Sequence, residues 1–347
     1  MRASVMATTI GCVLAVTTPL QSQESYGLAG DRVAVYNLAG QVEVVAGGGG
    51  EVTVQVLAGG DDAERLSVEV SEIRGMTTLR VLYPDDQVVY RPEGRGRFRT
   101  TLRVREDGTF GGGMGGDRVE IRSGGSGLEA HADLRIVVPA GRSLDLHNAV
   151  GEVTAQGLDG DLRVDVSSGP IRVTDITGNV ELDTGSGSVE ARGIQGELEV
   201  DTGSGSVTIE DVDGPWVMVD TGSGGVQGTA IRADRLEVDT GSGRVELMAL
   251  AAPDVTVDTG SGGVELEFTA SVENLEVDTG SGGVTVRLPA DLNAEIEVDT
   301  GSGGIDVDFP VEVETMRRNY FSGVVGNGRG RIVIDTGSGG VRLLGSR

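Results

Sequence analysis

The pentapeptide Asp-Thr-Gly-Ser-Gly is the pattern in this chain that most directly suggests chemistry, because Asp-Thr-Gly-Ser is also the tetrapeptide of aspartic proteases. It occurs eight times, and the copies begin at Asp183, Asp201, Asp220, Asp239, Asp258, Asp278, Asp299 and Asp335. Aspartic protease chemistry needs two such loops facing each other, so that two carboxylates share one proton. Here the copies recur every 18 to 21 residues, with one interval of 36, and would line one edge with all carboxylates pointing the same way. The repeat therefore argues against a protease.

Other catalytic groups are scarce. The chain has two histidines, His131 and His147, and neither lies near a recognisable nucleophile motif. Its single cysteine, Cys12, lies close to the N-terminus, so clusters of Cys and His with metal-ligand spacing are absent as well. We expect that the protein is not an enzyme.

Calcium is the one cofactor that the sequence leaves open. The candidate cation row comprises Asp183, Asp201, Asp220, Asp239, Asp258, Asp278 and Asp299. Five glutamates stand two positions before an aspartate of the repeat, namely Glu181, Glu199, Glu237, Glu276 and Glu297. Stacked copies would form columns of carboxylate oxygens, which are the ligands that a hard cation prefers.

A short arginine-rich stretch interrupts the acidic character of the chain. It comprises Arg91, Arg95, Arg97, Arg99, Arg103 and Arg105. Phe98 lies within it, and a glycine-rich loop at 111–116 follows. Two interpretations stay open: a solvated insert whose arginines pair with the acidic body, or a binding patch for an anionic ligand.

The flanks of each pentapeptide predict the elements that position it. Around Asp201, apolar Leu198 and Val200 precede the turn and Val207 and Ile209 follow it, with polar residues between them. Alternation with a period of two predicts a half-buried strand on each side of a tight turn. Each repeat is therefore a strand, a fixed corner, a second strand and a second corner of variable length.

Repeats at a period near 19 residues predict an all-β fold, a parallel β-solenoid. A single repeat cannot bury enough apolar surface to offset its backbone entropy, so neighbouring coils must stack about 4.8 Å apart. The segments at 165–169 and 147–151 continue the register upstream, and 319–323 is interpreted as a decayed copy. We expect both glycines of the pentapeptide to allow positive φ, and Asp or Ser oxygens to accept bonds from turn amides.

Three segments are predicted along the chain. Residues 1–23 resemble a secretory signal peptide, with Arg2, an apolar stretch too short for a stable membrane anchor, and a polar end. Cys12 lies inside it in a weak lipobox context, so lipoprotein processing stays open as an alternative to a soluble mature chain. Residues 24–130 form an irregular β segment with the Arg/Gly-rich insert at 91–116, and residues 131–347 form the solenoid. No transmembrane span is expected in the mature chain.

Composition and charge restrict the classes of partner that the protein can bind. Among 347 residues there are 58 glycines but only 9 prolines, and no collagen-like period is present. The formal net charge is −26, with 54 acidic residues against 28 basic ones, all arginine. Nucleic acids would be repelled by this charge, which excludes them as partners.

The repeats, together with the segments from Val33 to Val44 and from Gly326 to Gly339, resemble the bacterial β-strand-repeat proteins known as the putative-adhesin family, a domain of unknown function. The resemblance covers nearly the whole mature chain. It implies an exported β-solenoid and carries over no catalytic residue.

The sequence thus predicts an exported, acidic, non-enzymatic β-solenoid that binds an unidentified ligand at the cell surface or in the cell envelope, in a periplasmic, cell-surface or extracellular location. Two alternatives stay open: a β-helix enzyme acting on polysaccharides, which should gather acids and arginines on a few adjacent coils, and a regulatory or scaffold module of the envelope.

Overall fold

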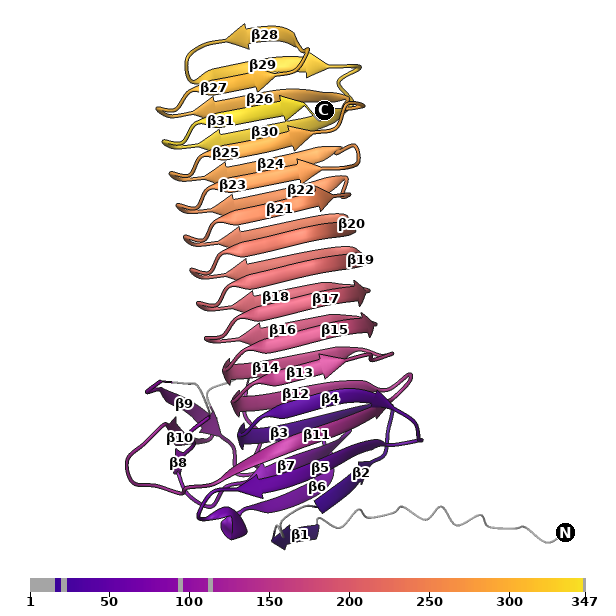
Figure 1. Ribbon diagram of the computed structural model, residues 1–347, viewed down its shortest axis with the longest axis vertical. Coiled ribbons are helices and arrows are strands. Elements are labelled where there is room, and N and C mark those ends of the chain that lie inside the picture. The colour runs from indigo at the N-terminus through magenta and orange to yellow at the C-terminus, as the bar shows by residue number, and fades with distance from the viewer. Residues whose placement is uncertain (1–15, 20–23, 93–95, 112–114, 346–347) are drawn as a thin grey trace, which may run out of the picture.

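The computed structural model describes residues 16–19, 24–92, 96–111 and 115–345, which form a tall stack of coils on a broader base (Figure 1). Each coil lays one strand in each of two sheets, and like strands of successive coils pair in parallel. We call the sheet before the pentapeptide corner the first sheet and the sheet after it the second sheet. The predicted all-β parallel solenoid is confirmed.

The strands of the first sheet, in stacking order from the base, are β3 (Arg32–Ala39), β12 (Ser143–Val150), β14 (Leu162–Ser168), β16 (Val180–Thr184), β18 (Leu198–Thr202), the second halves of β19 (Val207–Thr221) and β20 (Val226–Thr240), β22 (Asp254–Thr259), β24 (Asn274–Thr279), β30 (Gly330–Thr336) and β26 (Ala294–Thr300). The strands of the second sheet, in the same order, are β4 (Val42–Gly47), β13 (Val153–Gln156), β15 (Ile171–Thr177), β17 (Val189–Gln195), the first halves of β19 and β20, β21 (Val245–Leu250), β23 (Val264–Phe268), β25 (Val284–Leu288), β31 (Val341–Gly345) and β27 (Ile305–Asp308).

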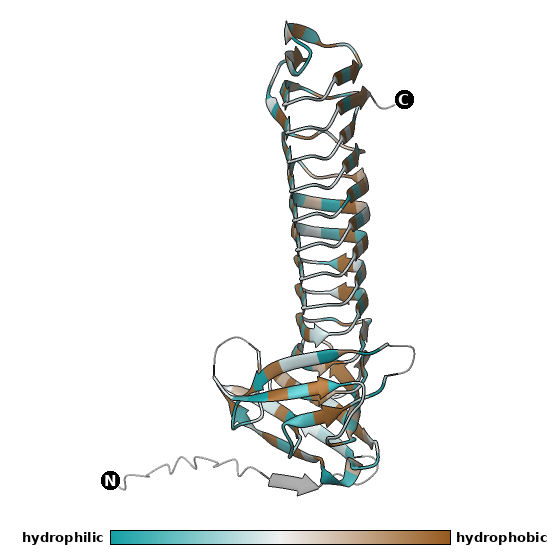
Figure 2. Cartoon of the chain, turned by 90° about the vertical axis from the view of Figure 1, so that its left-hand side faces the viewer, coloured by the Kyte–Doolittle hydropathy of each residue, from teal (hydrophilic) through white to brown (hydrophobic). Residues whose placement is uncertain are grey.

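The core fills the space between the two sheets with columns of aliphatic side chains. Val257 pairs in register with Val238 on one side and Val277 on the other, and it is 1% exposed. Its neighbour Thr256 points outward and is partly exposed. Apolar and polar residues alternate along the strands in this way throughout the stack (Figure 2). The inward and outward faces predicted from the period-two pattern are confirmed.

The coils at the C-terminal end are not stacked in chain order. Asp335 pairs with Asp278 on one side and with Asp299 on the other, so the last coil, β30 and β31, lies between the coils that precede it in the sequence (Figure 1). The interval of 36 residues holds an antiparallel cap, β28 (Glu312–Met316) and β29 (Tyr320–Val325), in which β29 pairs antiparallel with β26. The interpretation of 319–323 as a decayed parallel copy was therefore wrong, because this segment reverses direction.

The base is built from antiparallel strands that cover the first coil. The strands are β1 (Val16–Pro19), β2 (Glu24–Leu28), β5 (Val52–Gly59), β6 (Ser67–Ile73), β7 (Met76–Leu82) and β11 (His131–Pro139), with the short 3₁₀ helix η1 (Ala63–Arg65). β7 and β11 pair in parallel with β3 and β4, and antiparallel with β6 and β5. Beside them lies a three-stranded sheet of β8 (Gln87–Val89), β9 (Arg99–Val104) and β10 (Asp117–Arg122). The predicted segment boundary near residue 131 stays a prediction, and strand pairing joins residues on both sides of it.

Most of the predicted signal peptide, Cys12 included, lies outside the described residues. The described part, Val16–Pro19, is β1, which pairs antiparallel with β6. Over the described ranges, the structure contains no helix that is long and apolar enough to cross a membrane.

Candidate functional site

The pentapeptide aspartates form one row along an edge of the stack. Register pairs each aspartate with its counterpart on the next coil, from His147 and Asp165 through Asp183 up to Asp335 and Asp299. Cation-row members beyond Asp183 are exposed. The row is thus continuous, and the segments at 147–151 and 165–169 do continue it.

Threonine, not aspartate or serine, satisfies the turn amides of the corner. Thr259 is fully buried, accepts a hydrogen bond from the Gly262 amide at 2.9 Å and donates one to the Gly243 carbonyl of the preceding coil at 3.2 Å. The same bridge recurs at Thr202, Thr221, Thr240, Thr279 and Thr336. The expectation that Asp or Ser oxygens fill this role was wrong, because the inward-facing residue of the turn is the threonine.

The glycines of the pentapeptide are required by close packing between coils. None of them has positive φ, contrary to our expectation. A Cβ on Gly262 would lie 1.6 Å from the Gly243 carbonyl oxygen, a distance at which no side chain fits. The corner motif therefore specifies how tightly neighbouring coils approach each other.

Several aspartates of the row have a raised pKa, in part because like charges lie close together. Burial, and then the neighbouring carboxylates Asp165 and Asp201, raise the pKa of Asp183 to about 6. Burial and an adjacent aspartate also raise the pKa of Asp220, Asp239 and Asp335. Partial burial and mutual repulsion therefore disfavour the ionised form of these aspartates.

The cation row stays a prediction. Several of the flanking glutamates already have other partners, since Glu181 binds Arg163, Glu237 lies 3.3 Å from Arg235 and Glu297 accepts a bond from Tyr320. In the part of the chain that the structure describes, no group of three or more His, Cys, Asp or Glu residues is arranged to hold a metal ion.

The arginines of the insert are spread over several environments. Arg91 pairs with Glu129 at 3.1 Å and Arg99 with Glu120, whereas Arg103 donates to the Gly116 carbonyl at 3.0 Å. Arg105 turns to the hydroxyl of Thr109, 3.0 Å away. Arg97 is exposed and lines a hollow of about 550 Å³ beside Phe98, and Arg95 lies outside the described residues.

Strand pairing adds two arginines that the sequence analysis did not include in the patch. Arg118 lies opposite Arg103 and Arg122 opposite Arg99 on the outer face of the small sheet. They were missed because β10 follows the glycine-rich loop, and only the antiparallel register brings them beside β9. The anionic-ligand patch stays a prediction, now centred on this sheet face.

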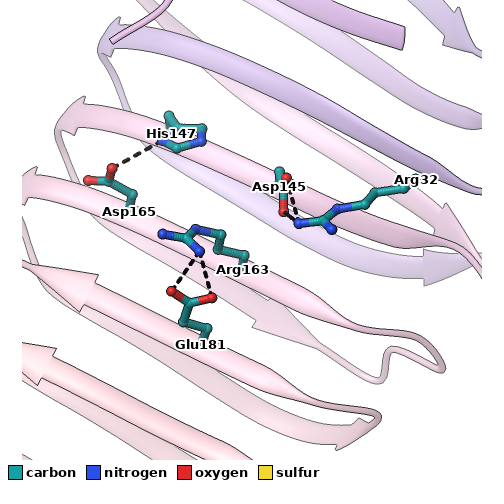
Figure 3. A network of polar contacts seen from close by, with 6 residues as sticks. All are labelled: Arg32, Asp145, His147, Arg163, Asp165 and Glu181. Atoms are coloured by element: carbon teal, nitrogen blue, oxygen red, sulfur yellow. Dashed lines mark hydrogen bonds and ion pairs between the residues drawn. The ribbon is translucent and has the colours of Figure 1, made fainter. Parts of the chain in front are cut away.

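His147 links the insert to the first coils. Its ring stacks on Tyr36 with centroids 4.3 Å apart. Its Nδ1 lies 3.1 Å from Asp165 Oδ2 (Figure 3). Phe110 packs edge-on against Tyr36 at 5.5 Å, so the end of the insert lies over this pair. His147 occupies the position of the aspartate row on its coil, in line with the predicted register of the segment at 147–151.

A second cluster of polar residues lies on the outer face of the first sheet, near the base. Arg32 binds both carboxylate oxygens of Asp145 at 2.9 Å, and Arg163 binds Glu181 at 2.7 Å on the neighbouring coils (Figure 3). The bond with Asp145 raises the pKa of Arg32, so this guanidinium stays charged. Arg163 and Glu181 lie directly opposite each other on neighbouring strands, whereas Arg32 reaches Asp145 diagonally, because its register partner on β12 is Ser143.

These pairs form part of a shallow groove of about 230 Å³, which we call the outer-face groove. It is lined by Arg32, Ser143, Asp145, Asp161, Leu162, Arg163, Asn179, Val180, Glu181, Glu197, Glu199 and Trp216. The sequence analysis did not bring these acids and arginines together as one cluster. The pair of Arg32 and Asp145 is separated by 113 positions in the chain, so no local pattern could reveal it.

The chain was compared with known proteins. The profile of the Toastrack DUF4097 family matches residues 105–344. The chain belongs to this family. The Toastrack match spans the coils from β12 to β31 and part of the small sheet, whereas the first coil, β3 and β4, lies outside it.

The other comparisons provide no argument about function. Among solved structures, a putative cell adhesion protein from Clostridium sporogenes aligns over 96% of this chain and 99% of its own, at 9% identity and a TM-score of 0.24. The search of curated proteins gave no match. We therefore base the functional argument on the Toastrack solenoid and on the geometry of its surface.

Proposed function

We propose that this Toastrack protein is an exported, non-enzymatic binding protein of the bacterial cell surface or envelope. The observation that carries the proposal is the outer-face groove, where charge pairs and the single tryptophan of the chain lie together on a few adjacent coils. Buried columns and interlocking corners hold the strands of this face in place, so its side chains are arranged before any ligand arrives. Export rests on the sequence of residues 1–23 and on the resemblance to the putative-adhesin family.

The non-enzymatic part of the proposal rests on the chemistry at hand. Both arginines of the groove bind carboxylates, which is an arrangement for holding charges in place. The two histidines also have structural surroundings, His147 against Tyr36 and His131 5.2 Å from Tyr90. A polysaccharide-acting enzyme and an envelope scaffold remain the competing functions.

Localisation provides the first test. The full chain with a C-terminal tag would be expressed in a bacterial host, and the fractions analysed by N-terminal sequencing and by protease treatment of intact cells. We expect a processed chain that begins near residue 24 in an exported fraction. An unprocessed chain that stays in the cytoplasm would overturn the proposal.

Binding provides the second test. The purified processed chain would be applied to a glycan array and to isolated bacterial envelopes. Saturable binding to either is expected. Absence of binding to both, or turnover of an applied polysaccharide, would contradict a non-enzymatic binding role.

A further inference from the structure

Trp216 is an unusual residue for its position on the solenoid. It is the only tryptophan of the chain, and no phenylalanine or tyrosine occurs between residues 111 and 267. Trp216 stands immediately before the first buried residue of its first-sheet strand. On the coils nearer the base, the equivalent position is occupied by Ser143, Asp161, Asn179 and Glu197. Trp216 is partly buried and lines one end of the outer-face groove. A flat apolar ring therefore ends a row of polar side chains.

Two polar side chains of the groove, Asp161 and Asn179, are held in position by the backbone of the next coil. Asp161 Oδ1 accepts the Asn179 amide at 2.9 Å, and Asn179 Oδ1 accepts the Glu197 amide at 3.2 Å. These bonds leave the Asn179 side-chain amide nitrogen as a donor. Glu197 and Glu199 are exposed and supply acceptors beside Trp216. The groove thus presents both donors and acceptors to a ligand.

Charge restricts the class of ligand. The lining contains two guanidinium groups and five carboxylates, and both guanidinium groups are paired with carboxylates. The remaining carboxylates, Asp161, Glu197 and Glu199, would repel a polyanion. A polycation would have to lie against the guanidinium groups of Arg32 and Arg163. A neutral ligand with many hydroxyl groups meets neither obstacle.

The shape of the groove indicates an extended ligand. From Ser143 to Trp216 the lining crosses four coil steps of about 4.8 Å each, which gives a length of roughly 19 Å. A sugar unit in an extended polysaccharide advances by a length similar to one coil step, and the apolar face of a pyranose ring stacks on indole. Hydroxyl groups at the ring edges would then meet a new set of polar side chains at each coil.

We propose that the outer-face groove binds a neutral polysaccharide chain that lies across the coils, with one sugar ring on Trp216 and its hydroxyl groups bonded to Asn179, Glu197 and Glu199. This inference rests on the proposed binding function and names its ligand class. The paired groups at Arg32 and Arg163 close the other end of the groove and contribute donors there.

The single tryptophan makes the test direct, because its emission reports on this groove alone. The purified full chain would be titrated with neutral hexasaccharides of glucose and of N-acetylglucosamine, and with glucose, an oligogalacturonate and hexa-arginine. We expect saturable blue shifts with at least one neutral hexasaccharide, and no shift with the monosaccharide or the charged ligands. No shift with any neutral hexasaccharide, or an equal shift with hexa-arginine, would overturn the inference.

Matched variants separate binding from folding, with affinity measured by calorimetry. Glu199 and Glu276 occupy the same column of the first sheet, so Glu199→Gln should weaken binding at least tenfold while Glu276→Gln leaves it unchanged. Trp216→Ala should abolish binding, and Trp216→Phe should restore part of it. Unchanged affinity in both Glu199→Gln and Trp216→Ala would refute the assignment.

The outcomes distinguish this inference from the proposed function. If the chain binds envelopes but no neutral glycan, the ligand class is wrong and the binding role stands. If the hexasaccharide is bound and then shortened, the groove is assigned correctly and the non-enzymatic function is wrong.

Discussion

The pentapeptide corner and the outer-face groove share the coils of β16, β18 and β19 but differ in how they use their residues. The corner repeats the same five residues, and its Thr and second Gly are inside the stack, where Thr259 joins two coils and Gly262 touches the coil before it. The groove changes its residues at every coil and keeps them outside. Uniform residues here maintain the spacing of the coils, whereas varied residues form a site.

The largest effect should come from placing a charge in the core. Val257→Asp would bury an unpaired carboxylate between Val238 and Val277, at a cost above about 4 kcal/mol. We expect the melting temperature to fall by more than about 10 °C, or the coils to open. Thr256→Asp, one residue away on the outer face, is the control and should change it by no more than a few degrees. Equal losses for the two variants would refute the assigned faces.

A methyl group at the corner should have the next largest effect. Gly262→Ala would push a Cβ to 1.6 Å from the Gly243 carbonyl oxygen. Overpacking of this kind costs about 1–3 kcal/mol, which we expect as a clear drop in melting temperature. At the adjacent Gly263 the nearest atom to an added Cβ is 3.5 Å away, so Gly263→Ala should be tolerated. A stable Gly262→Ala protein would mean that the coils are not held at this spacing by the corner.

The same contrast explains how much of the fold could be predicted from the sequence. Alternation around each pentapeptide placed Val257 inside and Thr256 outside, because strand periodicity is a local property. The order of the last coils was not predictable in this way, since Asp299 and Asp335 are both followed by Thr-Gly-Ser-Gly-Gly and either coil fits above Asp278. Likewise, the sequence predicted that the corner needs glycines, but the reason it gave, positive φ, was wrong. The actual reason is contact with another coil, which is not visible within one repeat.

The site was less predictable than the fold. Arg32 and Asp145 meet only because β3 stacks beneath β12, with the base and the insert between them in the chain. Trp216 has no partner in the repeat pattern, and this singularity is the one signal in the sequence that could have indicated the groove. Repeats reveal structure in this protein, and departures from the repeat reveal the candidate site.

A smaller effect is expected where a corner residue is partly buried. The pKa of Asp183 is raised to about 6, mainly by burial and then by Asp165 and Asp201. Its ionised form therefore destabilises the folded chain above this pH, and stability due to this group rises as the pH falls from about 7 to about 4. Asp183→Asn should stabilise the chain by about 1 kcal/mol at pH 7.5, after allowance for screening by water, and by almost nothing at pH 4.

Thermal melts of the two proteins across this pH range would measure the difference. Asp258→Asn, at a more exposed position of the row, is the matched control and should gain less. If Asp183→Asn were less stable than the parent at pH 7.5, the aspartate would be making a favourable contact, and the picture of a crowded row would be wrong.

The smallest effect concerns the exposed part of the aspartate row. Two unit charges at the coil spacing of about 4.8 Å repel by about 0.9 kcal/mol in water, and dissolved salt screens this repulsion. We expect sodium chloride to raise the melting temperature by a few degrees relative to a low-salt buffer with chelator.

Calcium at 1 mM should be compared with sodium chloride at equal ionic strength, because only a bound ion stabilises at so low a concentration. A further rise with calcium would establish the cation row, whereas equal curves would limit the row to screening. Three identical melting curves, including the one with chelator, would mean that repulsion along the row does not lower the stability of the fold. The presence of aspartate at every corner would then have to be explained by something other than its charge.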